Sequence, residues 1–207
     1  MKNGQMKESC TGVADLEDVQ PDIFVAFCEF AYHGTYNTPS LVDEPDDEKG
    51  QLLDICNSNP PCSLRTGGYY NSCARSSMEI CFGRLKYQTQ PVPTTHSPDL
   101  LFHAELYVFA TKYLVEPLRQ LCVSSLYRDL VAAREQKKPV RLILDLLAYT
   151  YAHTSTVEPA GVSPLRELVT LFVAGNANLL YQEERFKEIL RDNSEFGLVL
   201  IQLLCQV

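Results

Sequence analysis

Residues 100–114 constrain the fold of this chain most strongly, because they are nearly all apolar. The polar members of this stretch are His103, Glu105, Thr111 and Lys112. Glu105 and Lys112 are two helical turns apart, so a helix here has one narrow polar edge. A helix of that kind is buried on most of its sides. We therefore expect residues 100–114 to form a helix at the centre of the core, begun by Ser97 as N-cap and Pro98 in the first turn.

A shorter helix is predicted nearer the N-terminus, from Pro21 to the residue before Gly34. Proline is favoured in a first helical turn, and glycine is favoured as the left-handed residue that follows the last turn. Between them, apolar residues recur at steps of three and four, which places them on one helical face: Ile23, Phe24, Phe27, Cys28 and Ala31.

Further helices are predicted after a break at residues 115–117. In the first of them, one face is apolar and is expected to point inward: Leu118, Leu121, Cys122, Leu126 and Leu130. Its other face is polar and is expected to point to water: Arg119, Gln120, Arg128 and Asp129. The same periodicity predicts helices over residues 140–151, from Ser163-Pro164 onward, over a short stretch near residues 186–190, and over residues 196–204. A polar loop is expected at residues 153–161.

Residues from about 40 to 96 have a different character. They contain an acidic run at residues 43–48 and several clusters of Pro, Gly, Asn and Ser that are typical of turns and loops. No helical or strand period persists through them. We interpret this stretch as a long, largely disordered insertion.

The net charge of the 207-residue chain is −8 at pH 7. An acidic chain lacks the basic footprint that binding to nucleic acid or to anionic membranes requires, so neither partner is expected. No apolar run approaches the roughly 20 residues that span a bilayer, and the first residues have no apolar signal-peptide core. The cytoplasm, the nucleus or both are therefore the expected location, where the eight cysteines would be reduced thiols.

Residues for catalysis or for metal binding do not form a recognisable pattern. Cys56, Cys62, Cys73 and Cys81 are spaced six to eleven residues apart, without the close pairs that zinc sites usually present. His103 falls inside the buried helix, where a structural role is favoured over proton transfer. We therefore expect no metal, no cofactor and no enzymatic activity, and binding becomes the default class of function.

The predicted helices resemble the second half of a BTB/POZ domain. Residues 18–24 (DVQPDIF) and 27–36 (FCEFAYHGTY) are similar to the family's "D-V-x-P-x-x-F" turn and to the helix that ends in "Y-x-G-x-Y". Residues 103–113 (HAELYVFATKY) resemble its "H-A-x-x-Y-x-x-A-D-K-Y" helix, and the next helix is similar as well. The resemblance is closest to BTB proteins of filamentous fungi, and it covers the chain outside residues 40–96.

This resemblance implies an α+β family fold of which the chain carries the mainly α part. It divides the chain into a partial BTB/POZ domain at residues 1–131 and a C-terminal helical extension at residues 139–207. The front of a complete BTB domain, which builds most of the dimer surface, is expected to be missing. We hypothesise that Met1 is a misassigned start and that part of residues 55–90 is translated intron.

The function that the resemblance implies is protein–protein interaction. Some BTB proteins bind a cullin scaffold and so recruit substrates to a ubiquitin ligase, and the family also self-associates. By resemblance, the partner surface is expected around His33, Gly34, Tyr36, Tyr113 and Leu114. For Gly34 and Tyr113, a role as cap, turn or core residue is favoured over partner contact. The alternatives are a helical scaffold or transcription-associated interaction protein without a ligase link, and a truncated, non-functional gene model.

Overall fold

The computed structural model is mainly helical, as the sequence predicts, and it describes residues 19–40, 82–87, 89–93, 98–135, 139–158 and 161–205. Within these residues the named elements follow the chain in this order: α2 (Pro21–His33), α4 (Leu100–Lys112), α5 (Glu116–Glu135), α6 (Val140–His153), β1 (Val157–Glu158), β2 (Gly161–Val162), α7 (Pro164–Gly175), α8 (Ala177–Leu180), α9 (Glu184–Asp192) and α10 (Ser194–Cys205).

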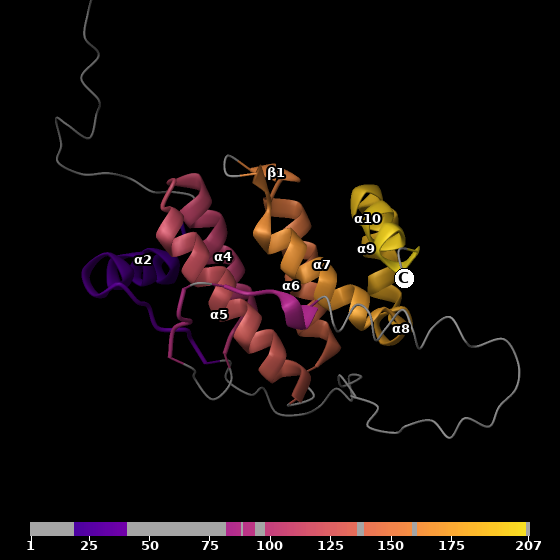
Figure 1. Ribbon diagram of the computed structural model, residues 1–207, viewed down its shortest axis with the longest axis horizontal. Coiled ribbons are helices and arrows are strands. Elements are labelled where there is room, and N and C mark those ends of the chain that lie inside the picture. Colours follow the sequence, from indigo (N-terminus) through magenta and orange to yellow (C-terminus); the bar gives the residue numbers. More distant parts are fainter. Residues whose placement is uncertain are drawn as a thin grey trace, which may run out of the picture.

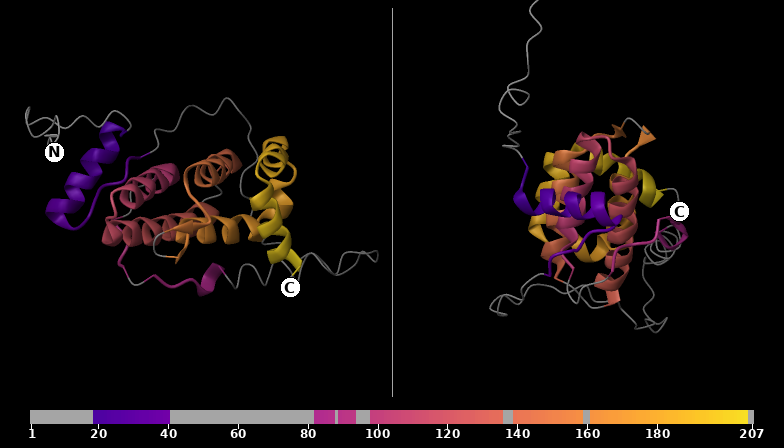
Figure 2. Two further views of the ribbon diagram at one scale, coloured as in Figure 1. Left: turned by 90° about the horizontal axis from the view of Figure 1, so that it is seen from above. Right: turned by 90° about the vertical axis from the view of Figure 1, so that its left-hand side faces the viewer.

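The central helices form two layers (Figures 1 and 2). Helices α4 and α6 make one layer, and α5 and α7 make the other, with α4 packed along α5 and α6 along α7. Helix α2 packs on α4 at one end of this arrangement, and α8, α9 and α10 lie at the other end (Figure 1). The apolar helix at residues 100–112 is central, as predicted, since it contacts α2, α5 and α6.

The ends of α2 and α7 are those that local sequence predicts. Pro21 stands in the first turn of α2, and Gly34 ends the helix with φ 72° while its N–H bonds the Phe30 carbonyl. Ser163 caps α7 through its side chain, which accepts a hydrogen bond from the Arg166 backbone N–H. Capping chemistry of this kind satisfies backbone groups that the helix itself leaves free.

The start of α4 differs from the predicted one. The N-cap is Asp99 instead of Ser97, because the Asp99 carboxylate accepts hydrogen bonds from the N–H groups of Leu101 and Phe102. Pro98 lies outside the helix, where it forms an isolated antiparallel bridge with Ser40. A carboxylate two residues further along therefore sets the helix start, while the proline belongs to the extended approach.

The core is one continuous cluster of buried side chains that includes residues from α2, α4, α5, α6, α7, α9 and α10. Its fully buried members come from both parts of the predicted domain division, for example Leu106 of α4 and Leu168 of α7. Residues of the C-terminal helices thus share a core with α4 and α5. The predicted inward face of α5 is confirmed, because Leu118, Leu121, Cys122, Leu126 and Leu130 are all buried.

The predicted polar loop at residues 153–161 contains a small hairpin. Val157 pairs with Val162 and Glu158 with Gly161 in antiparallel register. Val157 and Val162 are exposed, whereas the Glu158 side chain points inward and is buried. Glu158 is buried because Arg119 of α5 is its cationic partner.

The C-terminal end of the expected disordered insertion is ordered against the core, which corrects that prediction for residues 82–87 and 89–93. Residues 82–84 form a helical turn, and Phe82 and Val92 are buried. Residues 41–81 and 94–97, including the acidic run, lie outside the described residues. Most of residues 55–90, the stretch in which we hypothesise translated intron, also lies outside the described residues. Residues 82–87 of that stretch are described, and Phe82 packs on α5 and α7. Such packing is unexpected for translated intron.

Candidate functional site

The sequence-predicted partner residues do not form one surface. Tyr36 is 1% exposed and belongs to the core, so it is corrected from a surface residue to a structural one. His33 and Gly34 are exposed at the C-terminal end of α2, where Gly34 acts as the cap. Tyr113 and Leu114 follow α4 and are 39% and 75% exposed. The structure gives no contact that joins His33 or Gly34 to this second pair.

Apolar side chains on α2 and at the end of α4 form an exposed surface that sequence reasoning located only in part. Four rings follow one another across the two helices: Phe24 to Phe27 at 6.2 Å, Phe27 to Phe109 at 5.2 Å and Phe109 to Tyr113 at 4.5 Å between centroids. Phe24 is 40% exposed and Tyr113 is 39% exposed, while Phe109 is buried between them. We call these four rings, with Leu114, the α2–α4 surface.

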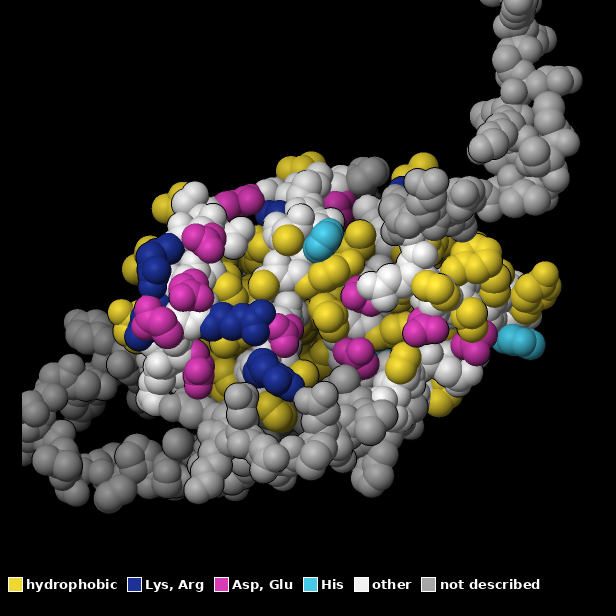
Figure 3. All heavy atoms as spheres, turned by 180° about the vertical axis from the view of Figure 1, so that it is seen from behind, with side chains coloured by type: hydrophobic (Ala, Val, Ile, Leu, Met, Phe, Trp, Pro, Cys, Tyr) yellow, Lys and Arg dark blue, Asp and Glu magenta, His cyan; other side chains and the backbone are white. Residues whose placement is uncertain are grey.

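The outer face of α2 extends this exposed apolar area. Val25 is 55% exposed and Tyr32 is 85% exposed, and their spacing of seven residues places them on one side of the helix. The inner face holds Ile23 and Ala26, which are buried. Figure 3 shows hydrophobic side chains gathered toward the end of the molecule where α2 lies, whereas Lys and Arg stand beside Asp and Glu toward the opposite end. Contiguous exposed apolar area is typical of a surface that binds a partner.

Leu114 has an unusual backbone for its residue type. Its φ is 57°, and among the described residues it is the one non-glycine residue in the left-handed region. This conformation costs an L-residue with a bulky side chain about 1–2 kcal/mol. The turn is fixed by hydrogen bonds from the Leu114 N–H to Thr111 O and from the Val115 N–H to Ala110 O. The turn therefore presents an apolar side chain to solvent where glycine or asparagine would be less strained.

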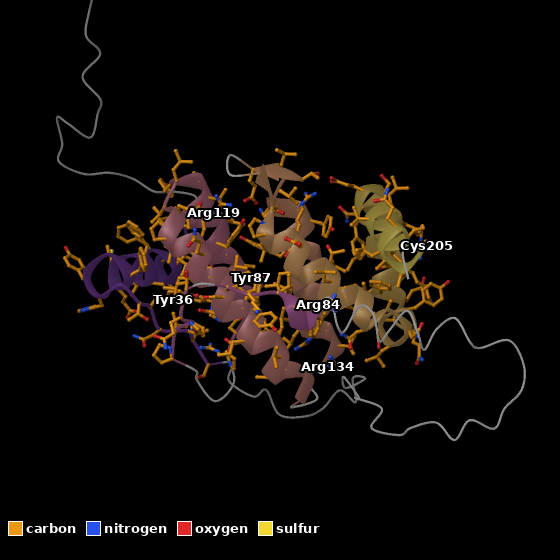
Figure 4. All side chains as sticks on the ribbon, viewed as in Figure 1. Tyr36, Arg84, Tyr87, Arg119, Arg134 and Cys205 are labelled. Carbon is orange, nitrogen blue, oxygen red and sulfur yellow. The ribbon has the colours of Figure 1, made fainter. Side chains whose placement is uncertain are left out.

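A chain of polar contacts crosses the core beneath this surface. The Tyr36 hydroxyl lies 2.6 Å from His103 Nδ1, and His103 Nε2 lies 2.9 Å from Asp129 Oδ2. Arg128 Nε donates to Asp129 Oδ1 at 2.6 Å, and another guanidinium nitrogen of Arg128 donates to the Val92 carbonyl. Tyr36, His103 and Asp129 are each at most 1% exposed. These contacts link the segment after α2 to α4, α5 and residue 92. Tyr36 is labelled in Figure 4.

The charge of Asp129 and the burial of Tyr36 indicate which groups donate in the contacts around His103. Burial acts to raise the pKa of Asp129, but hydrogen bonds from His103 and Arg128 outweigh it and hold the pKa below its ordinary value. Asp129 is therefore ionised at neutral pH, so His103 Nε2 carries a hydrogen and donates it. An imidazole with its hydrogen on Nε2 can accept a hydrogen bond from the Tyr36 hydroxyl at Nδ1. Burial raises the pKa of Tyr36 well above its ordinary value, which keeps that hydroxyl a donor.

This arrangement resembles a base held by a carboxylate, but its position argues for a structural role. The prediction that His103 lies inside a buried helix and is satisfied by partners agrees with these contacts. The prediction that Asp129 faces water is wrong, because the side chain is enclosed between His103 and Arg128. A substrate cannot contact groups without exposed surface, so in this conformation the contacts hold helices together.

A second buried polar cluster joins α4, α5 and the hairpin. Arg119 donates to Glu158 Oε2 at 2.5 Å, to Glu116 Oε2 at 2.8 Å and to the Tyr107 hydroxyl at 3.0 Å. The Tyr107 hydroxyl donates to Glu158 at 2.6 Å, and burial, followed by this hydrogen bond, raises the pKa of Tyr107 to about 12. Arg119 was predicted to face water and is 5% exposed. Helical periodicity could not predict this burial, because the partner Glu158 lies 39 residues away in the sequence.

Metal-ligand chemistry is not assembled in the part of the chain that the structure describes. No group of three or more His, Cys, Asp or Glu side chains is placed to hold an ion there. Cys122 is buried, Cys28 is half-buried and Cys205 is exposed, and none of these three is in a disulfide. Cys56, Cys62, Cys73 and Cys81 lie outside the described residues. Among the described helices, none is long and apolar enough to cross a membrane.

Comparison with known proteins gives this chain no relative. No protein-family model matches it, and neither a curated protein nor a solved structure shows significant similarity. The resemblance to BTB/POZ domains therefore stays a prediction from the residues quoted above.

Proposed function

We propose that this chain is a protein-interaction module of BTB/POZ type that binds a protein partner through the α2–α4 surface. The observation that carries the proposal is the row of rings from Phe24 to Tyr113, continued by the exposed side chain of Leu114. Aromatic residues that stand partly exposed on rigid helices are typical anchors of protein interfaces. Burial of one such side chain by a partner contributes about 1.5–3 kcal/mol.

Among the partners that the resemblance implies, we propose a cullin scaffold, which would make the chain an adaptor of a ubiquitin ligase. Helices α2, α4 and α5 lie at the three stretches that resemble the family, which supports a module of BTB/POZ type. Tyr113 and Leu114 were placed at the partner surface by the same resemblance, and both side chains are exposed. A helical scaffold without a ligase link would use the same surface for another protein, so the choice of partner in the test distinguishes the two.

Leu114 offers a variant that removes a contact without harming the fold. Asparagine tolerates the left-handed conformation better than leucine does, so Leu114→Asn deletes an exposed apolar side chain at no cost in backbone strain. Leu198 of α10 is a matched control, because it is 64% exposed at the other end of the molecule. We expect Leu114→Asn to weaken binding to the purified N-terminal region of a fungal cullin at least tenfold, measured by isothermal titration calorimetry.

Leu198→Asn should leave the dissociation constant within about twofold of the original, as expected for a residue outside the interface. A cullin that does not bind the unaltered chain would contradict the adaptor role. Equal loss from both variants, or a loss from Leu198→Asn alone, would show that the α2–α4 surface is not the binding surface.

A further inference from the structure

The segment at residues 82–93 is bound to α5 and α7 in the manner of a docked peptide. Its described residues beyond the turn at residues 82–84 form no regular secondary structure, and they run along one face of the α5–α7 layer (Figures 1 and 2). Phe82 is 6% exposed and Val92 is 2% exposed, so apolar side chains near both ends of the segment are buried. The segment thus contributes anchors to a surface that the helices provide.

The receiving surface is lined by aromatic residues. Phe82 packs on Tyr127 of α5 at 5.1 Å and on Phe172 of α7 at 5.4 Å between ring centroids. Tyr87 packs on the same Tyr127 at 5.4 Å. Figure 4 shows Tyr87 and Arg84 in one region over the middle of the molecule. We call Tyr127, Phe172, Ser125 and Arg128 the docking face.

The docking face also binds the main chain of the segment. The Val92 N–H donates to Ser125 Oγ at 3.1 Å, and the Val92 carbonyl accepts from Arg128. Pro91 and Pro93 flank Val92 and have no N–H, so Val92 supplies the one backbone donor of these three residues. A residue before proline favours extended backbone, which lowers the entropy lost when such a segment docks.

The two side chains that hold Val92 are themselves held in place. Ser125 is fully buried, and its hydroxyl donates to the Leu121 carbonyl at 2.8 Å, which leaves its oxygen as an acceptor for the Val92 N–H. Arg128 is oriented by Asp129, whose other oxygen bonds His103. A buried hydroxyl and a partly buried guanidinium are thus preorganised to bind the N–H and the C=O of one residue, which is a property of peptide-recognition sites.

Charge favours a basic peptide. Residues 82–93 contain Arg84 and Lys86 and no acidic residue, whereas the whole chain has a net charge of −8. Both cationic side chains are exposed, so they remain in solvent while the apolar residues are buried. A ligand with cations at these positions is opposite in sign to the net charge of the chain, which favours their association.

We propose that the docking face is a binding site for an extended, basic peptide with an aromatic residue followed by a Pro-Val-Pro core, and that residues 82–93 occupy it in cis. The ligand in trans is a segment of another protein with this chemistry. The segment in cis competes with it, because its tether gives an effective concentration on the order of millimolar. The site is separate from the α2–α4 surface, and its existence does not depend on the proposed function.

Val92→Asp tests the proposal in the full chain. An aspartate cannot be buried at this position without a partner, so the variant should release the segment in cis. A fluorescent peptide with the sequence of residues 82–93 should bind Val92→Asp at least tenfold tighter than it binds the unaltered chain, by fluorescence anisotropy. Adding Ser125→Ala to Val92→Asp should weaken this binding at least tenfold. The same peptide with aspartate in place of valine should not bind.

A folded Val92→Asp variant, with an unchanged far-ultraviolet circular dichroism spectrum, that shows no saturable binding would overturn the proposal. If the variant does not fold, hydrogen exchange of the unaltered chain decides instead. The Val92 amide should be protected at least 100-fold less than the Leu126 amide of α5, and excess peptide should reduce its protection further. Equal protection of the two amides would show that the segment is a permanent part of the core, which contradicts a displaceable ligand.

Discussion

At the scale of a residue, Asp129 is buried although its position on the polar side of α5 favours solvent, because a distant residue, His103, and its neighbour Arg128 both bind it. A carboxylate on the polar side of an amphipathic helix is expected to face water. Here its two oxygens accept from Arg128 Nε at 2.6 Å and from His103 Nε2 at 2.9 Å, and the side chain is fully enclosed. Charge-assisted hydrogen bonds on both oxygens offset the cost of removing the carboxylate from water.

The lowered pKa of Asp129 predicts how stability depends on pH. Its folded-state pKa lies below the ordinary value of 3.8, so the ionised group stabilises the fold above about pH 4. This contribution is lost as the pH falls through the folded-state pKa, when the group becomes protonated in both states. We expect Asp129→Asn to lower the free energy of unfolding at pH 7 by roughly 2–4 kcal/mol and to flatten its dependence on pH below 4. Urea unfolding at several pH values measures both effects.

Asp145 provides the control for this measurement. Its carboxylate pairs with Arg185 at 2.5 Å, but the two side chains are 34% and 47% exposed. Solvent screens a pair of this kind, so Asp145→Asn should change stability by less than about 1 kcal/mol. If Asp129→Asn and Asp145→Asn lowered the free energy of unfolding equally, burial would not explain the contribution of Asp129.

At the scale of elements, the hairpin of β1 and β2 depends for its stability on side chains from other elements. Two strands of two residues each cannot be stable alone. Glu158 holds the hairpin to α5 through Arg119, and Arg166 of α7 holds the preceding loop through Thr154 Oγ1 at 2.9 Å. Arg166 also pairs with Glu195 of α10 at 2.8 Å. The hairpin connects α6 to α7, and buried charged side chains hold it in place.

Removal of the Glu158 charge should loosen this connection. Glu158→Gln removes the buried carboxylate partner of Arg119 and leaves the half-exposed Glu116 as its remaining one, which we expect to cost roughly 3 kcal/mol. Hydrogen exchange should increase first at residues 155–158 and 161–163. Glu184→Gln is the matched control, because Glu184 is exposed and pairs with Lys187 and Arg191 in solvent. It should leave the denaturation midpoint unchanged, and a loss as large as that from Glu158→Gln would be contrary to expectation.

At the scale of the whole molecule, α6 and α7 pack on α4 and α5 across the division predicted at residues 131–139. Leu106 and Leu168 are both fully buried in the shared cluster, although they lie on opposite sides of that division. A core without a boundary favours one cooperative unfolding transition. We therefore expect the helices from α4 to α7 to unfold as one unit.

Core truncations on the two sides of the division test this unity. Leu106→Ala and Leu168→Ala should each lower the free energy of unfolding by about 2–5 kcal/mol. Each should also lower the melting temperature of all helices together, so that circular dichroism records a single transition. A melt in two steps, with Leu168→Ala affecting one of them alone, would indicate two units.

Local sequence was sufficient for most of the helices, for both ends of α2 and for the start of α7. Steps of three and four between apolar residues predicted α2, α5, α6, α7, α9 and α10. Pro21 marked the first turn of α2, Gly34 its C-cap and Ser163 the start of α7. These features depend on neighbours within one or two turns, which the sequence displays directly. The exposed apolar residues Tyr113 and Leu114 were identified by resemblance, whereas the outer face of α2 could have been found from Val25 and Tyr32.

Tertiary structure alone decided which polar residues are buried and which irregular segments are ordered. Arg119 and Glu158 are 39 residues apart, and Tyr36 and His103 are 67 apart, so no local pattern pairs them. Residues 82–87 and 89–93 have no period of their own, and they are ordered because Tyr127, Phe172 and Ser125 provide partners. The physical reason is common to both: periodicity reports which side of a helix is apolar, while the burial of a charge or a loop depends on partners that folding brings together.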